Sequence, residues 1–201
     1  MTPKYQLTQR DGEDTHYYGP RVHIFNNPMV RSALALLCKM DPEGQSPQPE
    51  FNRKITKLYR WLIMQALGCE MTTKEHSVQT RMAEFVGDKA IWTGNVVDFS
   101  RKVVVVSIPR AGMFPAQVCL DFLNEHVDPN NVRMDSLPMG RESDKDGHIS
   151  GAKISGAKIG GSVNGVTMII PDPMGASGAT IDTALHHYKD EGYGEPDKVL
   201  P

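Results

Sequence analysis

The stretch that decides the fold is VTMIIPDPMGASGAT, residues 166–180. It opens with a short apolar run rich in β-branched residues, which is typical of a buried strand. Small residues and Gly178 come next. A helical pattern then follows, with apolar positions at Ile181, Ala184, Leu185 and Tyr188. A strand that runs through a small-residue turn into a helix is typical of α/β proteins, where backbone amides and the helix dipole bind anions. We therefore predict an α/β domain with an anion-binding turn at this point.

The side chains of the turn suit a sugar phosphate. Ser177 and Thr180 add hydroxyl donors, and Asp172 follows the strand where a ribose hydroxyl would be bound. The turn lacks the lysine of a Walker A motif and the spacing of a G-x-G-x-x-G fingerprint, which argues against both of those nucleotide-binding classes. A simpler interpretation remains open, because a βα connection with a glycine turn and a capping serine is common.

Composition bounds the class of protein. The chain has 201 residues, enough for one compact domain with a substantial core. Its formal charge of −2 shows no basic excess, so a nucleic-acid partner is not expected. No apolar run approaches the length of a membrane span, and the N-terminus lacks the apolar region of a signal peptide. Three scattered cysteines form neither a metal-binding spacing nor a disulfide framework. We expect a soluble cytoplasmic protein with no membrane partner.

Residues 1–68 are expected to form an N-terminal arm and two helices. Residues 1–26 are polar, and we predict an irregular arm with one short strand at Val22–Phe25. His16 and His23 are expected to be surface residues and not ligands, because no carboxylate or cysteine stands at metal spacing.

Both helices have recognisable signals. Asn27 is a good N-cap and Pro28 suits the first helical position, so a helix is predicted from there to the turn at Asp41. A second amphipathic helix is predicted over 51–68. Its expected core-facing residues are Phe51, Ile55, Leu58, Leu62 and Ala66.

The remaining 69–201 are expected to form the α/β core. Alternating residues at 77–82 and 90–93 predict a β-hairpin arm. Val103–Ile108 is the strongest strand signal and predicts a central parallel strand, followed by a turn with Arg110 and Gly112 and a helix over 113–125. An arginine between a strand end and a helix start is placed to bind an anion, although a salt-bridged surface arginine is the simpler alternative.

Residues 169–180 resemble the phosphoribosyl-diphosphate (PRPP) loop of type I phosphoribosyltransferases. Most of that superfamily carries two adjacent acidic residues before the loop. Here Asp172 is followed by Pro173-Met174, which resembles the uracil phosphoribosyltransferase branch. Three positions differ from the usual residues of the branch but remain small: Gly175, Ser177 and Ala179. The resemblance implies an open, mainly parallel twisted sheet flanked by helices, with an N-terminal extension of helices and arm.

A second segment carries the same resemblance. Residues 106–112, VSIPRAG, are similar to the pyrophosphate-binding turn of that branch, with Pro109 in place of leucine. This turn often holds an unusual peptide geometry in the superfamily, which proline would either preserve or disturb. The long polar stretch 137–165 contains the repeat SGAKI-SGAKI and predicts a hairpin-like loop. Its Arg141 is similar in position to an arginine that closes over PRPP in the family, with His148, Lys153 and Lys158 as alternative cations.

The resemblance implies transfer of the phosphoribosyl group from PRPP to uracil, giving UMP and pyrophosphate. The residues it implies for PRPP binding are Arg110, Arg141, Asp172, Pro173, Met174, Gly175, Ala176, Ser177, Gly178, Ala179 and Thr180. Of these, Arg110, Arg141 and Asp172 are the expected catalytic residues. Mg²⁺ would be bound through PRPP, with no metal site in the protein itself, and a homodimer or larger homo-oligomer is expected.

Two alternatives stay open. A phosphoribosyltransferase for another base is one, and a non-catalytic regulator that binds PRPP is the other. Members of the family continue well beyond the position that matches Pro201, where their uracil-binding segment lies. We therefore expect that the chain is a fragment or that it lacks this segment, and in the second case it would bind PRPP without transferring it.

Overall fold

The computed structural model describes residues 7–39, 49–143, 149–175 and 177–201. Within 141–143 and 149–152 it describes the backbone alone. The chain divides into two compact units, Met1–Leu58 and Tyr59–Pro201. The division falls inside helix α2 (Glu50–Glu70), whereas the sequence placed it at the end of that helix.

The first unit is irregular up to helix α1 (Pro28–Cys38), whose start is as predicted. The Asn27 side chain accepts the amides of Met29 and Val30 at 3.0 and 3.2 Å. The predicted strand at Val22–Phe25 is wrong: the structure assigns no strand to these residues, and Phe25 forms an isolated β-bridge with Glu13. A single bridge fixes one residue pair and does not propagate into a ladder.

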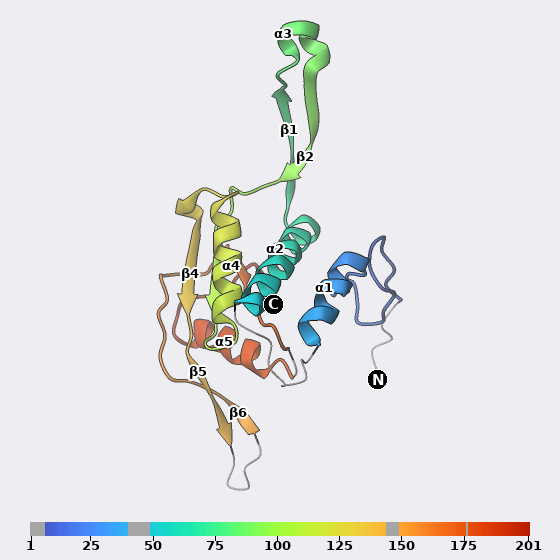
Figure 1. The fold of residues 1–201 in the computed structure, drawn as a ribbon. Helices are drawn as coiled ribbons and strands as arrows, with labels where there is room; N and C mark the ends of the chain where they lie inside the picture. Colours follow the sequence, from blue (N-terminus) through green and yellow to red (C-terminus); the bar gives the residue numbers. More distant parts are fainter. Residues whose placement is uncertain (1–6, 40–48, 144–148, 176) are drawn as a thin grey trace. The chain divides into compact units, whose positions relative to one another are not determined.

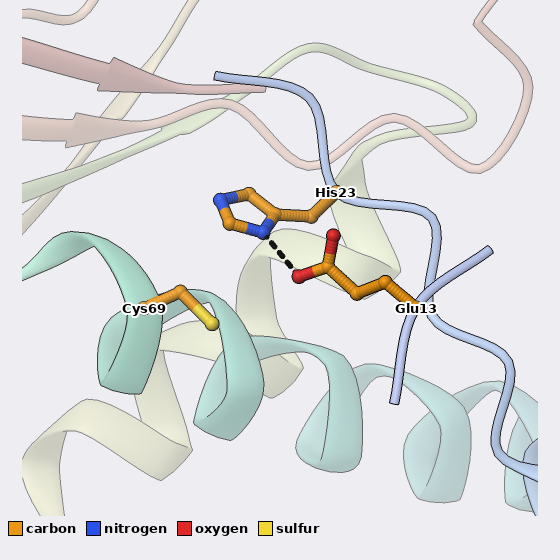
Figure 2. Close-up of side chains that lie close together, drawn as sticks. All are labelled: Glu13, His23 and Cys69. Atoms are coloured by element: carbon orange, nitrogen blue, oxygen red, sulfur yellow. Dashed lines mark hydrogen bonds and ion pairs between the residues drawn. The ribbon is translucent and has the colours of Figure 1, made fainter. Parts of the chain in front are cut away.

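The two histidines of this unit lie deeper than predicted. His16 is only 4% exposed, and it is held by a bridge to Thr8. His23 is half-buried, and its Nδ1 lies 2.7 Å from Oε1 of the buried Glu13 (Figure 2). The expectation that both are surface residues is therefore wrong, because paired backbone segments fold these side chains inward.

Helix α2 is amphipathic as predicted, and the predicted core residue Ile55 is buried, but the rest of the buried stripe differs from the prediction. Its buried residues are spaced four apart: Ile55, Tyr59, Ile63 and Leu67. Leu62, predicted to face the core, is 42% exposed. Several apolar residues stand on either side of this stripe, so composition alone did not specify which line of them packs.

In the second unit, the predicted hairpin arm follows the end of α2. Strands β1 (Thr73–Gln79) and β2 (Ile91–Val97) pair antiparallel, and helix α3 (Ala83–Val86) with the 3₁₀ turn η1 (Gly87–Ala90) forms the tip (Figure 1). Every residue of β1 is exposed.

The core of the second unit is a four-stranded parallel sheet, as predicted. Its spatial order is β4 (Val132–Ser136), β3 (Val103–Ser107), β7 (Thr167–Ile169) and β8 (Lys198–Leu200). All residues of β3 and β7 are buried, which is typical of central strands in a sheet covered on both faces.

The connections between these strands cover the sheet. Helix α4 (Met113–Asn124) joins β3 to β4, ahead of the short turn η2 (Pro129–Asn131), and helix α5 (Ala179–Asp190) joins β7 to β8. Between β4 and β7, strands β5 (Met139–Ser143) and β6 (Ile149–Ile154) form an antiparallel hairpin, as the sequence predicted.

Alternate residues of β3 supply both faces of the core. Val104 and Val106 belong to one buried cluster with Ala184 and Tyr188 of α5. Val103 and the other odd positions point to the opposite face and are also buried.

None of the helices in the described ranges has the length and apolar character needed to cross a membrane.

Candidate functional site

The strand order has a topological switch point between β3 and β7. The chain leaves β3 for β4 on one side of it, and later returns to β7 on the other side. Ligands of open α/β sheets bind at such a switch point, outside the carboxyl ends of the strands. The two segments that the sequence singled out are the ones that follow β3 and β7, so the topology brings them together.

The Arg110 turn links β3 to α4. The Gly112 amide donates to the Ile108 carbonyl at 3.0 Å, and the Met113 amide donates to the Arg110 carbonyl at 3.2 Å. The Pro109–Arg110 peptide is cis, so an unusual peptide geometry is present with proline at position 109. The Arg110 side chain is exposed and has no hydrogen bond or ion pair with the described residues. It is therefore available to an anion at this end of the sheet.

Gly112 brings the two turns into close contact. A Cβ placed on this buried glycine would lie 2.9 Å from the Ile108 carbonyl oxygen and 2.9 Å from that of Pro171. Both neighbours are backbone, so only glycine fits here. The sequence predicted Gly112 as a turn residue, but its contact with residue 171 carries no signal in the sequence.

The loop after β7 has the features of an anion cradle. Gly178 has a φ of +77° and is the N-cap of α5, a conformation that favours glycine. The Ala179 amide has a long 3.4 Å contact to the Ser177 hydroxyl. Within the described part of the chain, the amides of Ser177 and Gly178 donate to no other residue. These donors and the positive end of α5 are what a phosphate requires. Ala176, also predicted in this cradle, lies outside the described residues.

Asp172 opens the loop and is exposed. Its Oδ1 accepts the Met174 amide at 2.9 Å, which shapes the turn. Tyr59 of α2 was not predicted as a neighbour of this site. Burial raises the pKa of its phenol above the ordinary value, and the nearby Cys119 and Asp172 raise it further. Tyr59 could have been found in the sequence from its position on the apolar face of α2, but Leu58 was predicted to face the core there instead.

Arg141 lies on β5, in register with Ala152 of β6. Its side chain lies outside the described atoms, and so does the whole of His148. The base of the hairpin is held to β4, because Ser136 and Lys158 exchange two backbone hydrogen bonds of 2.9 Å.

An open groove of about 580 Å³ runs between β6 and α5. Its lining includes Lys153, Asp182, His186 and Asp190. The groove follows the body of α5 and not the loop that precedes the helix, so it is separate from the cradle.

Comparisons with known proteins agree with the geometry. No family model matches the chain. The chain is similar to two curated proteins named uracil phosphoribosyltransferase, from Synechococcus elongatus and Synechococcus sp.. Each is 32% identical over 96 residues, which cover 47% of this chain and 39% of the relative. The match therefore spans about two fifths of the length of these relatives.

A solved structure, that of AQ2163 from Aquifex aeolicus, has the same fold, with a TM-score of 0.60 and 19% identity. It covers 87% of this chain and 71% of that one. This structure shows the fold alone. The predicted similarity to uracil phosphoribosyltransferases is confirmed by the two curated relatives, while the roles of individual residues stay predictions.

Proposed function

We propose that this protein binds PRPP and transfers its phosphoribosyl group to a pyrimidine base, with uracil as the acceptor. The observation that carries the proposal is the meeting of the Arg110 turn and the 171–180 loop at the switch point of the sheet. Two anion-binding turns side by side suit a ligand with a phosphate at one end and a diphosphate at the other.

The 5′-phosphate of PRPP would occupy the cradle at the start of α5. The amides of Ser177 and Gly178 are available as donors, and the hydroxyls of Ser177 and Thr180 add to them. Asp172 keeps one carboxylate oxygen for the ribose hydroxyls while the other accepts the Met174 amide. Holding the phosphate and the sugar in this way fixes the anomeric carbon for attack.

The transferring sugar would develop oxocarbenium character while negative charge builds on the departing diphosphate. Arg110, and Arg141 from β5, would stabilise that charge, and a well-placed donor of this kind contributes roughly a hundredfold or more in rate. A Mg²⁺ ion carried by PRPP would neutralise diphosphate charge. The cradle supplies backbone donors and one carboxylate, Asp172, so it fits a metal that arrives on the ligand better than a resident ion.

Uracil is favoured as the acceptor by two observations. The relatives that match the sequence are named uracil phosphoribosyltransferase, and the Asp172-Pro173-Met174 form of the loop resembles that branch.

We also propose that the protein forms a homo-oligomer. The hairpin arm exposes large apolar side chains: Val78, Met82, Phe85, Ile91 and Trp92. Exposed apolar groups of this size are typical of association surfaces. Sedimentation of the purified protein tests this part of the proposal, and a monomer at all concentrations would contradict it.

The activity test is incubation with PRPP, Mg²⁺ and one nucleobase at a time, with pyrophosphate release as the readout. Release with uracil alone is the expected result. Release with another base would replace uracil in the proposal, and PRPP binding without turnover would indicate a regulator. Absence of PRPP binding would refute the proposed function.

A further inference from the structure

A buried carboxylate at the end of β4 holds two parts of the second unit together. Asp135 is 0% exposed, and the predicted site does not include it. Its Oδ1 accepts the Nε of Arg133 at 3.0 Å and the amide of Gly160 at 2.9 Å. Its Oδ2 accepts the Nη2 of Arg133 at 3.2 Å and the hydroxyl of Tyr188 at 2.8 Å. A buried charge is tolerated when it is paired and hydrogen-bonded, and both oxygens of Asp135 are satisfied.

One of these partners belongs to the helix that begins at the phosphate cradle. Tyr188 lies on α5, is 0% exposed and packs in the same cluster as Ala184. Burial raises the pKa of its phenol above the ordinary value, and the charge of Asp135 raises it further, so the hydroxyl remains a donor. The hydrogen bond ties the inner face of α5 to the edge strand β4.

The other partners belong to the segment that returns from the β5–β6 hairpin. Besides the Gly160 amide, Arg133 donates to the carbonyls of Gly161 at 2.9 Å and Ser162 at 3.2 Å. A Cβ on Gly160 would lie 2.9 Å from Cδ of Arg133, so the segment packs closely on this side chain. The hairpin root and α5 are therefore fastened to the same carboxylate.

We infer that Asp135 and Tyr188 are positioning residues that set the distance between the two ends of the PRPP site. The inference rests on the proposed function, in which the cradle before α5 holds the 5′-phosphate, and Arg110 after β3 and Arg141 of β5 hold the diphosphate. Asp135 stands opposite Val106 in the register of β4 and β3, so its hydrogen bond to Tyr188 also fixes α5 against the strand that leads to Arg110. A ligand held at both ends gains affinity from the fixed spacing of its two subsites, because binding at one end raises the effective concentration at the other. Weakening the hydrogen bonds that Asp135 accepts removes this gain in affinity and leaves each subsite intact.

The test compares ligands that fill one subsite with the ligand that fills both. Tyr188→Phe removes the hydrogen bond to Asp135 and retains the ring. Gly160→Ala displaces the Arg133 side chain, which is the other side-chain donor to Asp135. Tyr193→Phe is the matched control, because its ring packs edge-on against Tyr188 while its hydroxyl bonds to no residue in the described ranges. Binding of PRPP, ribose 5-phosphate and inorganic pyrophosphate to each folded protein is measured by calorimetry with Mg²⁺ present.

We expect Tyr188→Phe and Gly160→Ala to weaken PRPP binding roughly tenfold or more, and binding of the two partial ligands less than about twofold. The control should bind all three ligands as the wild type does. Equal losses for all ligands would show a general structural effect and overturn the inference, as would unchanged PRPP affinity in both variants. If the wild type binds ribose 5-phosphate and pyrophosphate no better than an unrelated protein does, and does not bind PRPP, the proposed function itself fails. That result is distinct from the failure of the inference alone.

Discussion

Replacing Gly112 by alanine perturbs the contact that joins the two turns that we propose to bind PRPP. The added Cβ would lie 2.9 Å from the carbonyl oxygens of both Ile108 and Pro171, about 0.5 Å inside the 3.4 Å at which ordinary van der Waals contact begins. Both oxygens belong to the backbone, so neither can move away as the end of a flexible side chain would. The Arg110 turn must therefore shift relative to the loop that starts at Asp172.

The shift is expected to lower both the stability of the protein and its kcat/KM for PRPP. Overpacking of this kind lowers the free energy of unfolding by about 1–3 kcal/mol. A misplacement of about 1 Å between binding groups costs roughly a hundredfold in rate, so we expect kcat/KM for PRPP to fall roughly 10- to 100-fold. The assay is pyrophosphate release with uracil at varied PRPP, combined with PRPP affinity from calorimetry and a urea titration.

Gly68→Ala provides a control outside the site. A Cβ at Gly68 of α2 meets nothing within 4 Å, and its φ lies outside the left-handed range. This variant should keep the wild-type kcat/KM within about twofold, since it introduces no contact. If Gly112→Ala is folded and also keeps PRPP affinity and kcat/KM within that margin, the two turns do not act on one ligand and the reasoning is refuted.

Three further predictions follow from local contacts. Arg110→Gln removes an exposed charge, so kcat/KM should fall roughly 10²- to 10³-fold while the Tm stays unchanged, by activity assay and calorimetry. Asn27→Ala removes the acceptor of two helix amides and should lower the free energy of unfolding by about 1 kcal/mol in a urea titration. Burial raises the pKa of the Cys119 thiol to about 12, so an aromatic disulfide reagent should modify it far more slowly than the exposed Cys38. The folded state keeps this proton at higher pH than the unfolded state does, so the contribution of Cys119 to stability should be full below pH 9.0 and decline toward pH 12.

Each of these has its own control. Arg101→Gln also removes an exposed charge, but one paired with Asp197, and a comparable loss of activity there would contradict the role given to Arg110. Asn27→Ser retains a capping oxygen and should be close to wild type; equal destabilisation by Ser and Ala would rule out the cap as the cause. Cys119→Ala should flatten part of the alkaline decline in stability, and an unchanged pH profile would show that this thiol does not contribute.

Much of the fold was predictable because its signals are local. The run of β-branched residues at Val103–Ile108 favours a strand wherever it stands, and it forms β3. Asn27 and Pro28 start α1 through contacts within one turn, and the hairpins β1–β2 and β5–β6 pair neighbouring segments. The prediction that Leu62 of α2 faces the core is wrong, because more than one face of this helix carries apolar residues and hydrophobicity alone does not distinguish between them.

The two candidate turns were also predictable, each from its own residues. Gly178 in a small-residue loop before a helix, and Arg110 between a strand and a helix, are patterns that backbone geometry and charge explain without further context. The proposal that one ligand uses both turns depends on strand order, because β3 pairs with β7 across more than sixty intervening positions of the chain.

The sequence by itself thus determined the kinds of element in this protein and the chemistry of each turn, since propensity, capping and glycine geometry act within a few residues. Only the tertiary structure decided that Gly112 touches the carbonyl of residue 171 and that Asp135 fastens Tyr188 and Gly160 to one strand. The physical reason is that these contacts join segments far apart in the chain. A hydrophobic period tells which face of an element is buried, but the partner on that face is selected by packing and hydrogen bonding of the whole domain.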